Sequence, residues 1–135
     1  MEAWEKWWKM AQDSLASALL LQQHGQHRAS ASRSYYSAYQ AATALLLYQN
    51  LIPPQGREAW SHDLTPDLLR NIPGKLLKTN ISKDIALRLE GAYDLRLIAD
   101  YISGVQVDEV KLKVSLKSVG FIYKVVRDIL SQEEV

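Results

Sequence analysis

The sequence predicts an all-α protein, an antiparallel bundle of four long helices with one short helix in a longer crossover. Three observations lead to this prediction. Apolar residues recur at intervals of three and four along four long stretches, all four prolines lie between residues 50 and 81, and no stretch alternates as a strand would. The 135 residues suffice for one hydrophobic core. We therefore expect a single helical domain over residues 1–135.

The first two predicted helices are joined by a turn at Gly25. The first spans about residues 3–23, and Gly25 ends it because glycine tolerates a positive φ. The second spans about residues 28–49. Asn50 and the proline pair that follows it end this second helix.

The crossover follows the second helix and contains the short helix. Thr65 has the side chain of an N-cap, and Pro66 suits the first helical position because its missing N–H is not needed there. These residues predict a short helix over residues 66–71. The rest of the crossover is irregular.

Two more long helices complete the predicted bundle. The third spans about residues 82–102 with Ser82 as its N-cap, and Gly104 follows its end. The fourth begins at Asp108, with Glu109 in its first turn, and continues to an acidic tail.

The composition excludes several classes of protein. The chain has 16 basic and 15 acidic residues, so its net charge of +1 lacks the strong positive excess typical of nucleic-acid-binding proteins. The absence of cysteine excludes disulfides and thiolate metal sites. No apolar run approaches the ~20 residues of a membrane span, and the N-terminus does not resemble a signal peptide. We expect a soluble, cytoplasmic protein with no membrane partner.

Neither a metal nor a cofactor is expected. His24 and His27 are three residues apart, but Gly25 interrupts the helix that would align them, and no carboxylate motif stands nearby. The chain also lacks a glycine-rich phosphate loop, a nucleophile elbow and a pair of catalytic carboxylates in a recognisable motif. Motifs of this kind therefore do not identify an enzyme.

The end of the third long helix carries the most informative polar residues. Tyr93, Arg96 and Asp100 are three and four residues apart, so they share one face of a helix that begins as core. A guanidinium stays charged at ordinary pH, so an inward-facing Arg96 needs partners. Tyr101 follows, where a phenol can face a groove. The same spacing also suits an Arg96–Asp100 salt bridge at the bundle edge, worth roughly a few tenths of a kcal/mol.

The second helix carries a comparable set of side chains. Arg33 and Tyr36 share a face, and Tyr35 and Tyr39 lie on the adjacent face. Either the tyrosines are core residues whose hydroxyls reach the surface, or they line a site together with Arg33. His62, in the crossover, is the best-placed free imidazole in the chain.

Three short motifs follow one another along the chain: a Tyr-Tyr-x-Ala helix after an arginine, one histidine in the next loop, and Leu-Arg-x-x-Ala-Asp-Tyr at the end of a later helix. In this order they resemble the HEPN superfamily, small helical domains of prokaryotic toxin–antitoxin and defence systems. The likeness is strongest to an uncharacterised branch that carries both helical motifs, and it covers about residues 11–130. The matching residues are Arg33, Tyr35, Tyr36, Ala38, His62, Leu95, Arg96, Ala99, Asp100 and Tyr101.

The resemblance implies an antiparallel bundle that forms a homodimer. Many HEPN domains are metal-independent ribonucleases whose Arg-x4–6-His motifs meet in a cleft at the dimer interface. Many are encoded beside a minimal nucleotidyltransferase that acts as antitoxin, in some cases by adding nucleotides to a tyrosine just after the motif. By this likeness, a polar groove for RNA or nucleotide would be lined by Arg33, Tyr36, Arg96, Asp100 and Tyr101.

The sequence departs from the ribonuclease pattern at one point. No histidine follows Arg96, and Tyr101 stands where the histidine could be. A phenol with a pKa of about 10 is a poor general base at neutral pH. We therefore expect a dimeric binding or regulatory component, paired with a nucleotidyltransferase. The alternatives are a ribonuclease that uses Arg96 with His62 or Tyr101, and an assembly module whose arginines only lock helices together.

Overall fold

The computed structural model describes residues 1–132 and is all-helical over that range, which confirms the predicted fold class. The predicted acidic tail extends beyond the described residues. None of the described helices is both long and apolar enough to cross a bilayer. The helices are α1 (Ala3–Gln23), α2 (His27–Tyr48), α3 (Leu64–Arg70), α4 (Thr79–Tyr101) and α5 (Glu109–Ser131).

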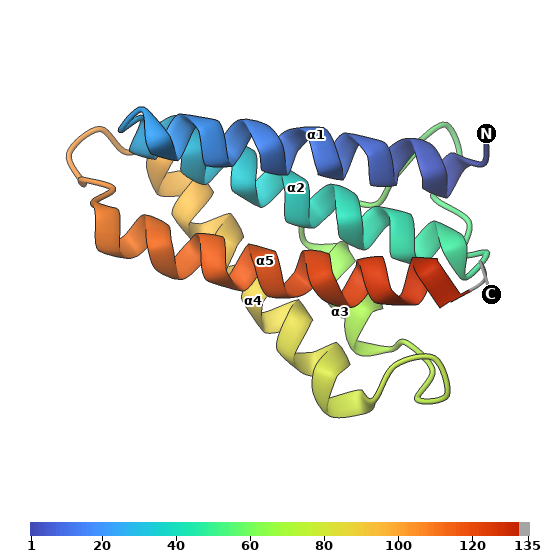
Figure 1. The fold of residues 1–135 in the computed structure, drawn as a ribbon. Helices are drawn as coiled ribbons and strands as arrows, with labels where there is room; N and C mark the ends of the chain where they lie inside the picture. Colours follow the sequence, from blue (N-terminus) through green and yellow to red (C-terminus); the bar gives the residue numbers. More distant parts are fainter. Residues whose placement is uncertain (133–135) are drawn as a thin grey trace.

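Helix α2 is the centre of the bundle. It contacts α1, α3, α4 and α5, and 13 of its 22 residues are buried. Helix α1 runs antiparallel to α2 along one side, whereas α4 crosses behind α5 at an oblique angle (Figure 1). The short α3, within the crossover, packs on α4 and also contacts α2. The main core therefore lies around α2, and the opposite side of α4 is less completely covered.

Small residues bring α1 and α2 close together. Ala11 and Ala18 of α1 have no exposed surface, and their carbonyl groups accept hydrogen bonds from serines of α2. Ser37 Oγ donates to the Ala11 carbonyl over 2.8 Å, and Ser30 Oγ donates to the Ala18 carbonyl over 2.7 Å. Since a buried hydroxyl without a partner is costly, these bonds favour the observed packing of the two helices.

Most predicted helix ends are confirmed. Gly25 has φ +71° after α1, and Asn50 has φ +67° after α2, the left-handed conformation that ends a helix. Asp108 caps α5, because its Oδ1 accepts a hydrogen bond of 2.8 Å from the Lys111 N–H. Helix α2 begins and ends one residue earlier than predicted.

The predicted start of the short helix is wrong. Helix α3 begins at Leu64, so Thr65 and Pro66 are its second and third residues and not its N-cap and first residue. Ser61 serves this turn instead: its Oγ accepts from the Leu64 N–H over 3.1 Å, and its carbonyl accepts from Thr65. Thr65 is completely buried, so its hydroxyl turns back to the main chain within the bundle.

The predicted start of the third long helix is also wrong. Helix α4 begins at Thr79, and Ser82 lies inside it. The Lys78 carbonyl accepts the N–H of both Ile81 and Ser82 over 3.0 Å, which forms the first turn before Ser82 is reached. Ser82 is fully buried, and its hydroxyl has no partner among the described residues. Serine is a common N-cap residue, but here it occupies a tight buried position inside the helix and does not mark a helix boundary.

Candidate functional site: the arginine–tyrosine cluster between α2 and α4

Arg96 points from α4 into the protein. Its side chain is 12% exposed, and its Nη2 donates a hydrogen bond of 2.8 Å to the Tyr36 hydroxyl on α2. Its Nε lies 2.9 Å from Asp100 Oδ2, but the N–H does not aim at that oxygen, so the contact is an ion pair. Burial alone would lower the pKa of Arg96, but Tyr36, Asp100 and Tyr101 outweigh it and raise the pKa. The charge is therefore held in place by its neighbours.

Two guanidinium groups meet at the ring of Tyr36. The Cζ atoms of Arg33 and Arg96 lie 5.1 Å and 5.2 Å from its centroid, within the range of cation–π contacts. Arg33 Nε is buried and has no hydrogen-bond partner among the described residues. Asp100 pairs with Arg96, so the cluster keeps an excess of positive charge and a spare N–H donor.

Asp100 and Tyr101 form the exposed edge of this cluster. The side chain of Asp100 is 28% exposed and accepts a hydrogen bond of 3.3 Å from Ser32 Oγ on α2. Tyr101 is 71% exposed, and the Arg96 Cζ lies 5.5 Å from its ring centroid. A molecule from solvent can therefore reach the phenol ring beside the buried guanidinium.

The fold brings His62 into contact with the same tyrosines. Its ring lies between Tyr39, at a centroid distance of 4.6 Å, and Tyr93, stacked at 5.4 Å, while Tyr36 is 6.2 Å away. Its Nδ1 shares a hydrogen bond of 2.5 Å with the Tyr35 hydroxyl. The crossover is anchored here, because the Tyr39 hydroxyl donates to the Trp60 carbonyl. The cluster thus contains the two arginines, five tyrosines and one imidazole.

The surroundings of His62 keep its imidazole neutral. Burial is the main cause that lowers its pKa below the ordinary 6.5, and the charge of Arg96 lowers it further, against the weaker effect of Asp63. Burial also raises the pKa of Tyr35, so its phenol stays protonated. A neutral imidazole can accept a proton, which is the property that a general base needs.

A shallow depression opens beside His62. Its volume is about 470 Å³, and its lining includes aromatic side chains and one exposed arginine. The lining includes Trp7, Tyr39, Arg57, Trp60 and His62. Aromatic faces and a cation are the groups that bind the bases and phosphates of single-stranded nucleic acid.

Sequence reasoning missed Arg28, which holds the end of α4 in place. Its guanidinium donates to the carbonyls of Ile98 and Ala99 at 3.0 Å and 2.9 Å, and also to those of Ile102 and Val105. These bonds occupy carbonyls that a helix C-terminus leaves without partners. A signal was available, because the first turn of α2 holds basic residues and no acid, which opposes the helix dipole.

The described residues offer no cluster of ligands for a metal ion. No three histidine, aspartate or glutamate side chains converge anywhere in residues 1–132. His27 instead lies with its Nδ1 3.2 Å from the Val107 carbonyl, next to the loop that Arg28 holds.

These observations define a class of protein: a small helical domain with arginines and tyrosines gathered in a half-buried site between two helices. The family model for the HEPN domain matches residues 4–129, and the chain belongs to this family. The predicted resemblance is thereby confirmed. A stretch of 49 residues, 36% of the chain, is also 47% identical to a UPF0332 protein from Pyrococcus horikoshii. That match spans about a third (34%) of the relative's length.

Proposed function

We propose that this HEPN domain is a dimeric binding or regulatory protein whose arginine–tyrosine cluster binds RNA or a nucleotide. The observation that carries the proposal is the pair of guanidinium groups on the Tyr36 ring, with a buried Arg33 N–H that lacks a partner in the described part of the chain. Phosphate is the ligand that satisfies these donors and neutralises the excess charge.

Each residue of the site has a role in this proposal. Arg96 and Arg33 contact a phosphate, Asp100 orients the Arg96 guanidinium, and Tyr36 accepts its hydrogen bond. Tyr101 offers an exposed ring on which a base can stack. The roles follow from which groups face solvent and which are held by neighbours.

The proposal includes a partner as well as a ligand. HEPN domains commonly form dimers, and the family resemblance favours a prokaryotic toxin–antitoxin or defence system with a minimal nucleotidyltransferase as the second protein. In such a system the domain would act in the cytoplasm. Co-expression with the product of a neighbouring nucleotidyltransferase gene, followed by size-exclusion chromatography, tests for a complex. Separate elution of the two proteins would contradict this part of the proposal.

Fluorescence anisotropy with labelled single-stranded RNA, and with labelled ATP, tests the binding site. We expect the wild-type protein to bind one of them. Arg96→Ala should weaken binding roughly 10- to 100-fold, because a hydrogen-bonded charge pair is worth about 1.5–3 kcal/mol. The matched control is Arg127→Ala, an exposed arginine on α5 that pairs with Asp128 and should leave the affinity unchanged.

Two results would overturn the binding proposal. In the first, the wild-type protein binds neither RNA nor nucleotide. In the second, Arg96→Ala binds as well as the wild type. If Arg96→Ala only lowers the melting temperature, the arginines serve to assemble the helices.

A second candidate function, a metal-independent ribonuclease, is favoured by the position of His62. The neutral imidazole contacts Tyr36, which also holds Arg96. In this reaction His62 removes the proton of a ribose 2′-hydroxyl, whose oxygen attacks the adjacent phosphorus while Arg96 stabilises the charge. The P–O5′ bond breaks, and the leaving oxygen takes up a proton. Tyr101 is the alternative base.

Incubation with a mixed RNA pool in EDTA separates the two functions. A ribonuclease cleaves the pool, and both Arg96→Ala and His62→Gln abolish cleavage. If Tyr101 is the base, Tyr101→Phe abolishes it instead. If the protein binds RNA in the anisotropy assay but leaves the RNA pool intact, the ribonuclease function is excluded and the binding function remains.

A further inference from the structure

A groove runs between α4 and α5, away from the arginine–tyrosine cluster. Its volume is about 490 Å³, within the range of pockets that hold small organic molecules. Its lining is mostly apolar, and three aliphatic side chains beside it are largely exposed: Leu87 at 66%, Val110 at 71% and Val114 at 64%. Aliphatic side chains gathered in one groove favour an apolar ligand.

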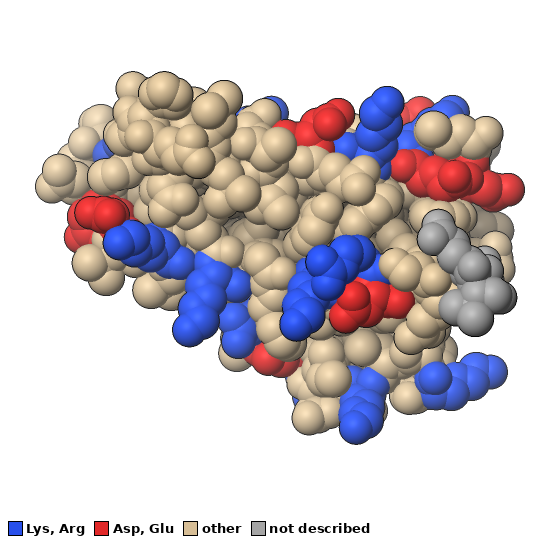
Figure 2. Space-filling view, viewed as in Figure 1, with Lys and Arg blue, Asp and Glu red and all other residues tan. Residues whose placement is uncertain are grey.

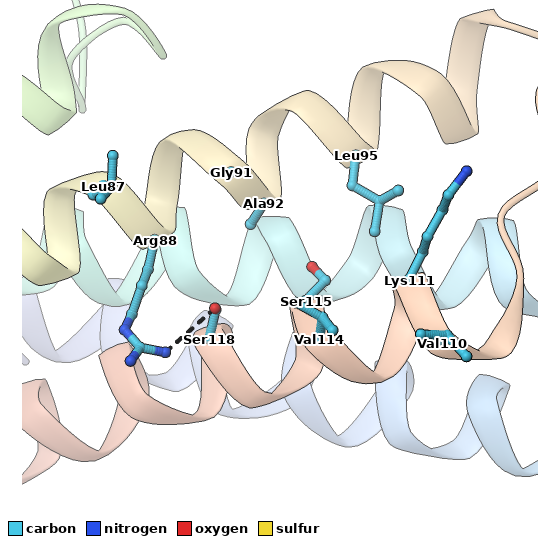
Figure 3. A pocket seen from close by; sticks show the side chains of 10 residues that line it. All are labelled: Leu87, Arg88, Gly91, Ala92, Leu95, Val110, Lys111, Val114, Ser115 and Ser118. Atoms are coloured by element: carbon cyan, nitrogen blue, oxygen red, sulfur yellow. Dashed lines mark hydrogen bonds between the residues drawn. The ribbon is translucent and has the colours of Figure 1, made fainter.

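Small residues create this groove. Gly91 and Ala92 of α4 face Ser115 of α5, where larger side chains would close the space between the helices (Figure 3). A Cβ atom built at Gly91 meets nothing within 4 Å. A Cβ atom at position 91 is therefore accommodated without displacing a neighbour.

The groove has a cationic side chain at each end, and the two differ in their partners. Arg88 and Lys111 stand at opposite ends, with Ala92, Leu95 and Ser115 between them (Figure 3). Arg88 is engaged by Asp84, by Ser118 and by the Phe121 ring. Within residues 1–132, the one polar contact of Lys111 Nζ is 3.4 Å to the Gln106 carbonyl. The Lys111 end is thus the one that can receive an anion.

Ser115, between the two ends of the groove, adds a second donor on α5. The residue is 7% exposed, its Oγ has no hydrogen-bond partner among the described residues, and its hydroxyl points across the groove toward α4 (Figure 3). Lys111 and Ser115 are four residues apart on α5, so both side chains lie on one face. In Figure 3 the Lys111 ammonium points away from Ser115, so one carboxylate can accept hydrogen bonds from both once the flexible lysine side chain turns along α5. Lys and Arg side chains also follow the exposed side of α5 in Figure 2.

We propose that the α4–α5 groove binds a small organic acid with an apolar chain. The carboxylate accepts hydrogen bonds from Lys111 and Ser115, and the chain lies over Gly91, Ala92 and Val114. Binding gives the buried Ser115 hydroxyl its missing partner and removes exposed aliphatic surface from water.

Isothermal titration calorimetry with octanoate, 1-octanol and octylammonium tests the proposal on the full chain. The three probes share one chain and differ in their head group. We expect octanoate to bind at one site per chain, about tenfold tighter than octanol, because a charge-assisted hydrogen bond is lost with the alcohol. Octylammonium should bind more weakly than octanol, since Lys111 repels it.

Variants locate the site. Gly91→Leu should abolish octanoate binding, because Gly91 lines the groove and a leucine side chain there occupies its space, while the Cβ atom meets no neighbour. Lys111→Gln should weaken octanoate about tenfold and leave octanol unchanged. The matched controls are Gly120→Leu and Lys124→Gln. Both residues lie on α5 outside the groove lining, and a Cβ atom at Gly120 likewise meets nothing within 4 Å.

Any of four outcomes would overturn the proposal. The first is the absence of a heat of binding with octanoate, and the second is equally tight binding of octanol and octanoate. The third is a Gly91→Leu variant that binds octanoate like the wild type and melts at the same temperature. The fourth is a change of oligomeric state in Gly91→Leu, measured by light scattering, which would make the groove a contact between protein chains. None of these outcomes depends on whether the protein binds RNA.

Discussion

Helix α4 has two unlike surfaces. The surface toward α2 and the crossover is filled by rings, and its charged groups pair with neighbours: Arg96 reaches Tyr36 and Asp100. The surface toward α5 is hollow where Gly91 and Ala92 face Ser115, and the Ser115 hydroxyl has no partner among residues 1–132. One helix therefore borders a packed polar cluster and a half-empty apolar groove.

The difference follows from side-chain size and from the location of donors and acceptors. A buried guanidinium is tolerated in the cluster because acceptors from α2 and from the same helix meet it. The groove persists because glycine, alanine and serine cannot span the distance between two diverging helices. In the cluster Arg96 is paired within the protein, whereas Arg33 Nε keeps a free donor among the described residues. In the groove the Ser115 hydroxyl is the buried donor without a partner there.

Removing the centre of the cluster should have the largest effect on stability. Tyr35 is 1% exposed and lies among the rings of Tyr36, Tyr39 and Tyr93. We expect Tyr35→Ala to lower the free energy of unfolding by about 3–5 kcal/mol because it leaves a cavity. Tyr35→Phe should cost about 1 kcal/mol, since it loses only the bond to His62.

Urea denaturation followed by circular dichroism measures both effects. The exposed Tyr101→Phe is the control and should change the unfolding free energy by less than about 0.5 kcal/mol. If Tyr35→Ala does not fold, Tyr35→Phe still tests the cluster. Equal stability of Tyr35→Phe and the wild type would show that the hydroxyl bond contributes nothing.

Loss of the Arg28 contacts should have an intermediate effect. We expect Arg28→Ala to cost about 1–3 kcal/mol, because carbonyls at the end of α4 lose charged donors. Arg28→Lys should recover only part of this, since an ammonium cannot match the fork of a guanidinium. Hydrogen exchange of the last-turn amides of α4 should increase in both variants. The control is Arg57→Ala in the exposed loop, which should leave this exchange unchanged. If Arg28→Ala also leaves it unchanged, Arg28 does not hold the end of α4 in place.

Acidification should destabilise the cluster through His62. Its folded-state pKa lies below the ordinary 6.5, so the unfolded chain takes up the proton first as the pH falls. The stability contributed by neutral His62 is complete above pH 6.5 and is lost progressively below it. The melting temperature should fall more between about pH 7.5 and about pH 5.5 in the wild type than in His62→Gln. If the melting temperatures of the two proteins fall equally with pH, the lowered pKa of His62 does not contribute to the pH dependence of stability.

The smallest effect is expected in the groove, and it has the opposite sign. Gly91→Ala should raise the unfolding free energy by about 0.5–1 kcal/mol, because alanine restricts the unfolded chain and its Cβ meets no atom. The packed counterpart is Ala38→Leu on α2, a fully buried position, which should cost about 1–3 kcal/mol. If Gly91→Ala destabilises the protein, the groove is less open than described.

Sequence patterns predicted the helices and part of the site. Gly25, Asn50 and Asp108 mark helix ends by local chemistry, and the spacing of Arg96 and Asp100 placed their ion pair on one face. Thr65 and Ser82 misled the prediction, because small polar residues also occupy tight buried positions. Cap residues and small core residues look alike until the packing is known.

The sequence by itself determined where the helices run and which residues share a face, because these depend on neighbours within one or two turns. Only the tertiary structure decided which faces meet. It brought His62 to Tyr35 across 27 positions, joined Arg28 to a carbonyl 77 positions away, and left a groove beside Ser115. Such contacts depend on the relative placement of whole helices, which no local pattern of residues encodes.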